Sequence, residues 1–277
     1  MSPEFGIKRG IKRPERAEMA KASVRHPENL DAYSLYWRGV EMHRHFTRSD
    51  NPKGREVFEK VIALDPNYAR AYAAWAWTHY YDWQNRWIPG NPKESYQKGL
   101  DLAYKAVAPD PRDGWVRGTL ANFLLYGNKH DEAVAQFEEA LKANPNDADL
   151  LVFSSLVDLF GGRPKEALQR IKEAMRPNPY HPNWYFSSLG AAQYGAHDYK
   201  GGIETLRKMS PIGVHRAMLA ACLAQLGRME EARLETEKFL KDNPSFSLSY
   251  WASAQPFLHD KDRQHAVEGF IKAGLPR

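Results

Sequence analysis

Few side chains in this sequence of 277 residues stand in patterns that enzymes use for chemistry. His43 and His45 are two positions apart, so on a helix their imidazoles would point about 200° from each other. Zinc-binding helices instead place two histidines on one face, about four positions apart. Cys222 is the single cysteine and is flanked by alanine and leucine, which favours a small core side chain over a nucleophile.

Carboxylate pairs are present, but they stand where a solvated helix face is expected. Glu138–Glu139 and Glu230–Glu231 are such pairs, and neither has a partner group at a spacing that would complete a general acid/base pair. The sequence also contains no glycine-rich phosphate loop. We therefore predict no catalytic residue, no metal ligand and no cofactor, and we expect that the chain is not an enzyme.

A repeated pattern of small residues indicates the elements that must position any binding side chains. The small residues are Gly54, Gly99, Ala133, Ala167, Gly201, Ala232 and Ala266, which gives intervals of 45, 34, 34, 34, 31 and 34 residues. A residue that can serve as a core side chain follows four positions after each of them: Phe58, Ala103, Phe137, Ile171, Thr205, Thr236 and Phe270. A period near 34 predicts helix-turn-helix units in which the small residue allows two helices to approach closely.

With this spacing, residues 29–273 resemble a tetratricopeptide-repeat array of seven units. Phrases at 27–39 and 58–74, and the ending Gly-Phe-Ile-Lys-Ala-Gly-Leu-Pro, are similar to the C-terminal repeat region of bacterial class III adenylate/guanylate cyclase-like signalling proteins. The resemblance implies an all-α, right-handed superhelical solenoid of about seven helix-turn-helix repeats. It also implies a non-catalytic interaction module, with any cyclase activity in a domain absent from this chain.

We expect two parts in the chain. Residues 1–27 combine a start that resembles vector-derived sequence with a basic helical arm, and residues 28–277 form the solenoid. The expected repeats are approximately 29–68, 69–113, 114–147, 148–181, 182–212, 213–246 and 247–277.

The second unit carries about 11 extra residues between its expected helices, around Trp83 and Trp87. Insertions in repeat proteins map to loops on one face, which is often the binding face. The alternative is that both tryptophans fold back as a local hydrophobic plug. The sequence leaves both interpretations open.

The positive charge of the chain is concentrated in its first segment. The net charge is +5, and residues 1–27 hold seven basic and three acidic side chains, whereas the remainder is nearly neutral. We therefore expect no nucleic-acid partner, although binding through the basic arm is an alternative function. No apolar run is long enough for a membrane span, so we expect no direct membrane insertion. We expect a cytoplasmic location, or a periplasmic one if the parent protein has a preceding transmembrane helix.

The inner face of the predicted solenoid is the candidate binding site. In this architecture the first helix of each unit lines an inner groove, and interface hot spots are rich in Trp, Tyr and Arg. We predict that a protein or peptide ligand of unknown identity binds there, with Arg44 and Arg70 attracting acidic groups. Self-association into a homo-oligomer or scaffold is an alternative. The candidate residues are Tyr36, Arg44, Arg70, Trp77, Tyr80, Tyr81, Trp115, Asn122, Tyr126 and Phe160. The same helix phase places Val152 of the fourth unit and Asn183 of the fifth on this face.

A structural role is the alternative for these residues, because many of the rings could only pack helix against helix. Some tetratricopeptide proteins hold a C-terminal carboxylate with Lys and Asn residues on their first helices. Only Asn122 matches those residues in type, so that mode of binding is not expected.

Overall fold

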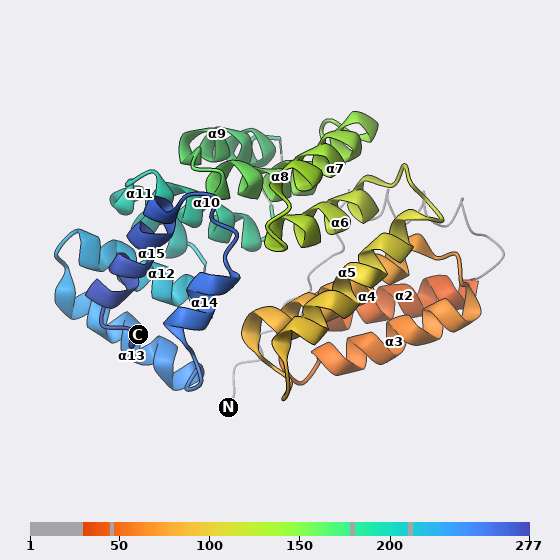
Figure 1. Cartoon of the computed structure of the whole chain (residues 1–277), viewed down its shortest axis with the longest axis horizontal. Helices are drawn as coiled ribbons and strands as arrows, with labels where there is room; N and C mark the ends of the chain where they lie inside the picture. The colour runs from red at the N-terminus through yellow and green to blue at the C-terminus, as the bar shows by residue number, and fades with distance from the viewer. Residues whose placement is uncertain (1–29, 45–46, 178–180, 210–212) are drawn as a thin grey trace, which may run out of the picture.

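The computed structural model describes residues 30–44, 47–177, 181–209 and 213–277, and all regular elements in these ranges are helices (Figure 1). The basic arm predicted at 1–27 lies outside the described residues. The helices are α2 (Leu30–Arg44), α3 (Asn51–Leu64), α4 (Ala69–Asn85), α5 (Pro92–Val107), α6 (Gly114–Tyr126), α7 (His130–Ala143), α8 (Ala148–Phe160), α9 (Pro164–Met175), α10 (Trp184–Gly195), α11 (Tyr199–Leu206), α12 (Val214–Gln225), α13 (Met229–Asp242), α14 (Leu248–Ala254) and α15 (Asp260–Lys272). The expected all-α solenoid is confirmed.

Capping side chains fix where several of these helices begin. The Asp113 carboxylate accepts hydrogen bonds from the first backbone amides of α6, and Asp147 does the same for α8. These bonds satisfy donors that have no partner inside the helix. Proline stands in the first turn of α5 and of α9, where its missing amide hydrogen is not needed.

The core is built at the positions that the repeat pattern singled out. All seven residues four positions after the small markers are buried, from Phe58 at 0% exposed to Thr205 at 5%. The small residues explain the closeness of the helices: a Cβ atom added at Gly99 of α5 would lie 2.5 Å from the ring of Phe123 in α6. Cys222 is also buried, as expected for a small core side chain.

The extra residues of the second unit mostly lengthen its helices. α4 has 17 residues and α5 has 16, whereas α6 and α7 have 13 and 14. We expected the insertion between the two helices of the unit. This is wrong for the first part of the insertion, because that part belongs to α4. Trp83 is buried inside α4, with its ring 5.2 Å from Tyr96 and 5.7 Å from Tyr126. Trp83 acts as a hydrophobic plug, and burial of its ring explains why the helix continues past Tyr81.

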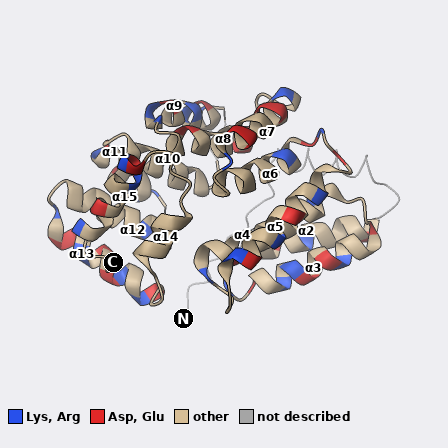
Figure 2. Cartoon of the chain, in the orientation of Figure 1, with Lys and Arg blue, Asp and Glu red and all other residues tan. Residues whose placement is uncertain are grey.

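The first and second helices of the units differ in how many charged residues they carry. Lys, Arg, Asp and Glu are frequent on second helices such as α7, α9 and α13, whereas α10 and α14 carry none (Figure 2). The first helices of the units thus present mainly apolar and uncharged polar side chains. Among the described residues, no helix is long and apolar enough to cross a membrane.

The series of helices curves until its last unit meets its second (Figure 1). α14 lies near the end of α4, where the Tyr250 hydroxyl donates a hydrogen bond to the Trp83 carbonyl at 2.8 Å. The core of the C-terminal half and the core around α4, α6 and α8 share one partly buried side chain, Phe257. The first helices of the earlier units therefore line one side of the inner face, and residues of the seventh unit line the other.

Candidate partner-binding face

Four aromatic rings from four successive first helices form a continuous row on the inner face. We call Trp77, Trp115, Phe153 and Trp184 the aromatic row. The Trp77 and Trp115 rings stack at 6.3 Å, Trp115 lies 6.0 Å from Phe153, and Phe153 stacks on Trp184 at 4.8 Å. Trp77 is buried, whereas the other three rings are partly exposed. A row of half-exposed rings offers apolar contact area to a partner.

Two hydrogen bonds fix the Trp77 end of the aromatic row. The indole nitrogen of Trp77 donates to the Thr119 hydroxyl at 3.1 Å, and that hydroxyl donates to the Trp115 carbonyl at 3.0 Å. α4 and α6 are thus connected by a side-chain bond from the Trp77 ring to Thr119. Rings that are fixed before binding lose little conformational entropy when a partner arrives.

The structure places five of the ten predicted site residues in the interior. They are all less than 9% exposed: Tyr36, Trp77, Tyr80, Asn122 and Phe160. Burial makes them part of the packing that supports the inner face, which is the alternative that the sequence left open. Four others are partly exposed: Arg70, Tyr81, Trp115 and Tyr126. Arg44 is the last residue of α2, and its side chain lies outside the described part of the structure. A direct contact between any of the ten and a partner stays a prediction.

Arg70 has a structural partner of its own. Its Nε atom donates to the Asp113 carboxylate at 2.6 Å, and the same carboxylate caps α6 by accepting from the Trp115 amide at 2.9 Å. The pair connects the start of α4 to the start of α6. Because Asp113 already offsets the positive charge, the attraction of Arg70 for an acidic partner would be weaker than the sequence suggested.

The buried Tyr80 of α4 and the partly exposed Tyr126 of α6 meet beside the aromatic row. Tyr80 is hydrogen-bonded to Tyr126, and their rings meet edge to face at 5.3 Å. Burial raises the pKa of Tyr80 well above its usual value, with the neighbouring Tyr126 adding to the effect. Burial also raises the pKa of Tyr126. Both hydroxyls therefore stay protonated at neutral pH and act as hydrogen-bonding groups between α4 and α6, not as bases.

The sequence missed two members of the aromatic row. In the fourth unit it selected Val152, which the structure buries against the Ala167 and Ile171 region of its own unit, whereas Phe153 lies in the row. In the fifth unit it selected Asn183, and the row is completed by Trp184, the next residue. A shift of one position turns a helical side chain by about 100°. Residue size was the signal that could have found both rings, because Phe153 is the first aromatic residue of α8 and Trp184 is the first residue of α10.

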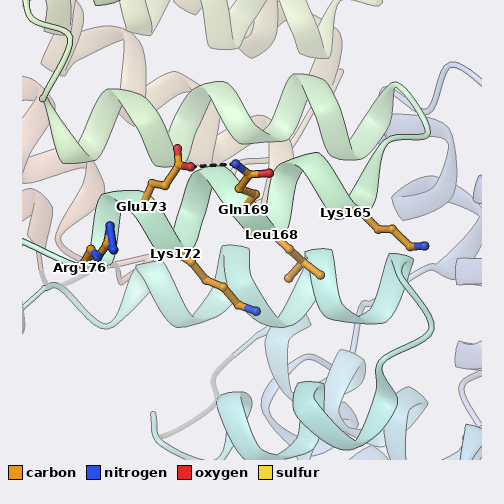
Figure 3. Close-up of a pocket in the computed structure, with 6 residues that line it drawn as sticks. All are labelled: Lys165, Leu168, Gln169, Lys172, Glu173 and Arg176. Atoms are coloured by element: carbon orange, nitrogen blue, oxygen red, sulfur yellow. Dashed lines mark hydrogen bonds between the residues drawn. The ribbon is translucent and has the colours of Figure 1, made fainter.

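A hollow of about 470 Å³ on the outer surface is a weaker candidate (Figure 3). It is lined by residues of α9 and its C-terminal end: Lys165, Leu168, Gln169, Lys172, Glu173 and Arg176. Figure 3 shows the one hydrogen bond among them, in which the Gln169 amide donates to Glu173 at 2.9 Å. Side chains of a single helix cannot surround a ligand from opposite walls. Among the described residues there is also no group of three or more His, Cys, Asp or Glu side chains that could hold a metal ion.

Comparisons with known proteins agree with the fold. A family model described as tetratricopeptide repeat matches residues 116–147, which include most of α6 and all of α7. Two curated relatives are the mitochondrial import receptor subunit TOM70 of Rattus norvegicus and that of Mus musculus. Each is 24% identical over 132 residues, or 48% of this chain, and the match spans only 19% of the relative's length.

Solved structures extend the likeness to most of the chain. The structure of the APC/C hetero-tetramer Cut9–Hcn1 has a TM-score of 0.62 at 13% identity, covering 88% of this chain and 46% of that one. The type IV pilus biogenesis factor PilW has a TM-score of 0.55 at 15% identity, with 79% and 96% covered. TTC0263, a thermophilic tetratricopeptide protein of Thermus thermophilus, has a TM-score of 0.50 at 18% identity, with 63% and 87% covered.

The chain thus contains one matched tetratricopeptide repeat at residues 116–147, and the solved structures show that its wider fold is that of helical repeat proteins. Proteins with this fold generally mediate protein–protein interactions and are typically non-enzymatic scaffolds. The narrower resemblance to cyclase-associated repeats stays a prediction.

Proposed function

We propose that this chain is a non-catalytic interaction module that binds a peptide or protein segment on its inner face. The observation that carries the proposal is the aromatic row, in which three partly exposed rings from α6, α8 and α10 form one surface. Of the residues that the sequence selected, Trp77 and Trp115 are in this row, and Tyr81 and Tyr126 are partly exposed outside it. The five buried site residues contribute by packing between the helices that carry the inner face.

The chemistry of the face favours apolar anchors in the partner. α10 carries no charged residue, and α6 carries only Arg117, which donates to Gln136 of α7 at 2.7 Å. The two acids of α8 already have partners: Asp149 accepts from the Tyr185 hydroxyl, and Asp158 pairs with Arg163 and Arg170. A partner segment with two or three aromatic or large aliphatic side chains would bury the rings of the row. Removing apolar surface from water supplies the free energy for such binding.

The proposal can be tested with a displayed peptide library selected on the purified full chain. Enriched peptides should bind at least ~10-fold more weakly to Trp115→Ala and to Phe153→Ala chains, because each change removes a central hot-spot ring. Tyr104→Ala is the matched control, since Tyr104 is an aromatic residue 46% exposed on the outer helix α5. Peptides that bind all three variants as they bind the unchanged chain would show that the inner face is not the site.

We further propose that the module is the regulatory part of a larger bacterial signalling protein of the adenylate cyclase-like kind. This rests on the sequence phrases at 27–39 and 58–74. Determination of the adjoining coding sequence would test it, because an adjoining cyclase domain is expected. A neighbouring domain of unrelated type, or a gene that ends at these borders, would refute it.

A further inference from the structure

The seventh unit does not continue the solenoid as the earlier units do. α14 has only seven residues and is followed by Gln255, whose backbone is extended with φ −84° and ψ 133°. Proline at 256 causes this end, because the residue before a proline disfavours the helical region. The chain then runs without regular structure until α15 begins at Asp260. We call residues 247–259 the closing segment.

The first half of the closing segment binds the end of α4. The Tyr250 hydroxyl donates to the Trp83 carbonyl at 2.8 Å, and the Arg86 guanidinium lies 5.2 Å from the centre of the Tyr250 ring. The Trp83 carbonyl lies in the last turn of α4 and also accepts a longer bond from the Arg86 amide at 3.4 Å, so the Tyr250 hydroxyl supplies its second and shorter bond. The cation adds attraction to the face of the same ring.

The second half of the closing segment binds the end of α8. The Leu258 amide donates to the Phe160 carbonyl at 2.9 Å, and the Phe257 ring meets the Phe160 ring edge to face at 5.1 Å. The next residue, His259, lies so close to the α8–α9 turn that a Cβ atom added at Gly162 would be 2.7 Å from its ring. The backbone bond and the ring contact both resemble what an extended peptide would make.

The helix that follows the closing segment is anchored elsewhere. Tyr194 of α10 donates to the His265 carbonyl at 3.0 Å, and Thr236 of α13 donates to the Ala273 carbonyl at 2.9 Å. α15 thus belongs to the core of the C-terminal half, which also contains buried Phe270. Leu248 and Trp251 of the closing segment pack in this same core, with the Trp251 ring 4.6 Å from Phe270, and Arg263 of α15 donates to the Phe257 carbonyl at 3.1 Å. The contacts with the ends of α4 and α8 can therefore open while Leu248 and Trp251 keep the segment on α15.

We propose that the closing segment is an internal ligand that occupies the edge of the inner face formed by the ends of α4 and α8. An external partner for this edge would carry the same chemistry: a tyrosine, and seven residues later a phenylalanine in an extended stretch that offers a backbone amide. This inference rests on the proposed function, which it deepens by naming the class of segment and the device that keeps the edge covered. A partner binds there by displacing Tyr250, Phe257 and Leu258 from the ends of α4 and α8.

A synthetic peptide of residues 247–260 with a fluorescent label is the probe, and its binding to the full chain is measured by anisotropy. The tethered segment competes at an effective concentration on the order of millimolar, so the unchanged chain should bind the peptide weakly. A Tyr250→Phe, Phe257→Ala chain should bind it at least ~10-fold more tightly, because the internal competitor is weakened. A peptide with Phe257→Ala should lose this binding. Leu258→Ala is the control chain, since this side chain is 57% exposed and its backbone amide is retained.

Equal binding to the unchanged and doubly substituted chains, or binding that is unaffected by Phe257→Ala in the peptide, would overturn the inference. Circular dichroism first checks that the doubly substituted chain is folded. If it is not folded, hydrogen exchange in the unchanged chain decides: the Leu258 amide should exchange faster than the amides within α15. Exchange at the same rate as global unfolding would overturn the inference. If library peptides bind the aromatic row but the 247–260 peptide fails, the proposed function survives and this inference does not.

Discussion

The third and seventh units carry the same sequence marker and build different structures. In the third, Ala133 and Phe137 are buried, and α7 packs on α6 of its own unit. In the seventh, Ala266 and Phe270 are buried as well, but α15 packs mainly on α12 of the preceding unit. A Cβ atom added at Gly269 of α15 would lie 1.8 Å from the Tyr194 hydroxyl of α10 and 3.4 Å from Ala221 of α12. The marker thus specifies that a helix is closely approached, and not which helix approaches it.

The difference follows from the length of the first helix in each unit. α6 has 13 residues, which is enough to cover α7, whereas α14 has seven. The short helix leaves α15 without a full partner inside its own unit, and α12 supplies the missing apolar surface. Regular units therefore give stability to the solenoid, and the irregular last unit gives a contact between distant parts of it.

The largest expected effect concerns the regular region. Phe137→Ala should lower the free energy of unfolding by about 3–5 kcal/mol, because a side chain only 2% exposed is replaced by a cavity. Denaturant unfolding followed by circular dichroism measures this change. Leu234→Ala on α13 is the control, since Leu234 is 55% exposed and its loss should change stability by no more than about 0.5 kcal/mol. Similar losses for the two variants would mean that the repeat core does not dominate stability.

The second expected effect is a loss of stability in acid through His79 of α4. His79 is 7% exposed, and burial, with the cations Arg55 of α3 and Lys98 of α5, lowers its pKa to about 4 from the usual 6.5. The unfolded chain therefore binds the proton more tightly than the folded chain. The stabilisation is complete above pH 6.5 and is lost as the pH falls toward 4, amounting to up to about 3 kcal/mol.

Denaturant unfolding between about pH 7.5 and about pH 4.5 tests this expectation. A His79→Gln chain should lose less stability over the same interval than the unchanged chain. Burial also lowers the pKa of His43 and of His215 to about 4, so part of the acid effect should remain in the variant. An identical pH dependence in both chains would show that His79 is not a source of the effect.

The sequence predicted the regular region well because its signal is local. Spacing of 34 residues and the small residue before each core side chain depend only on contacts between neighbouring units. The end of α14 was also readable in principle, since Gln255 precedes a proline. The contact of Tyr250 with Trp83 was not readable, because it joins residues 167 positions apart and depends on how far each unit turns relative to the one before it.

The candidate site was predicted less completely for a different reason. A helix phase that is wrong by one position exchanges an inner side chain for a core side chain, as happened with Val152 and Phe153. The sequence also could not decide which rings pack inside and which are exposed. Trp77 and Trp115 belong to one row, yet only Trp115 keeps a partly exposed ring.

A smaller effect is expected at the contact between the two halves. Tyr250→Phe removes the bond to the Trp83 carbonyl and keeps the ring, so the free energy of unfolding should fall by about 1 kcal/mol. Thermal unfolding of the two chains measures the difference. Tyr104→Phe, on the exposed side of α5, should leave stability unchanged. If both substitutions are silent, the hydrogen bond between the halves contributes nothing to stability.

The smallest expected effect is a weakening of the α15 anchor in mild acid. The His265 ring stacks on His197 at 4.2 Å, and its Nε2 atom is hydrogen-bonded to the Tyr199 hydroxyl at 2.9 Å. Burial lowers the pKa of His265 and the facing His197 lowers it further, whereas two carboxylates of its own helix act in the opposite direction and limit the shift: Asp262 and Glu268.

Because the folded chain binds this proton less tightly than the unfolded chain, the contribution of His265 to stability is present above pH 6.5 and declines as the pH falls below it. Amides of α15 should accordingly lose some protection from hydrogen exchange between about pH 7.5 and about pH 5.5, after correction for the intrinsic rates. A His265→Gln chain should lose less protection over that interval, and His259→Gln, at an exposed position, should behave as the unchanged chain. Loss of protection that is equal in all three chains would remove His265 from the anchor and leave polar contacts such as those of Tyr194 and Thr236 to hold α15.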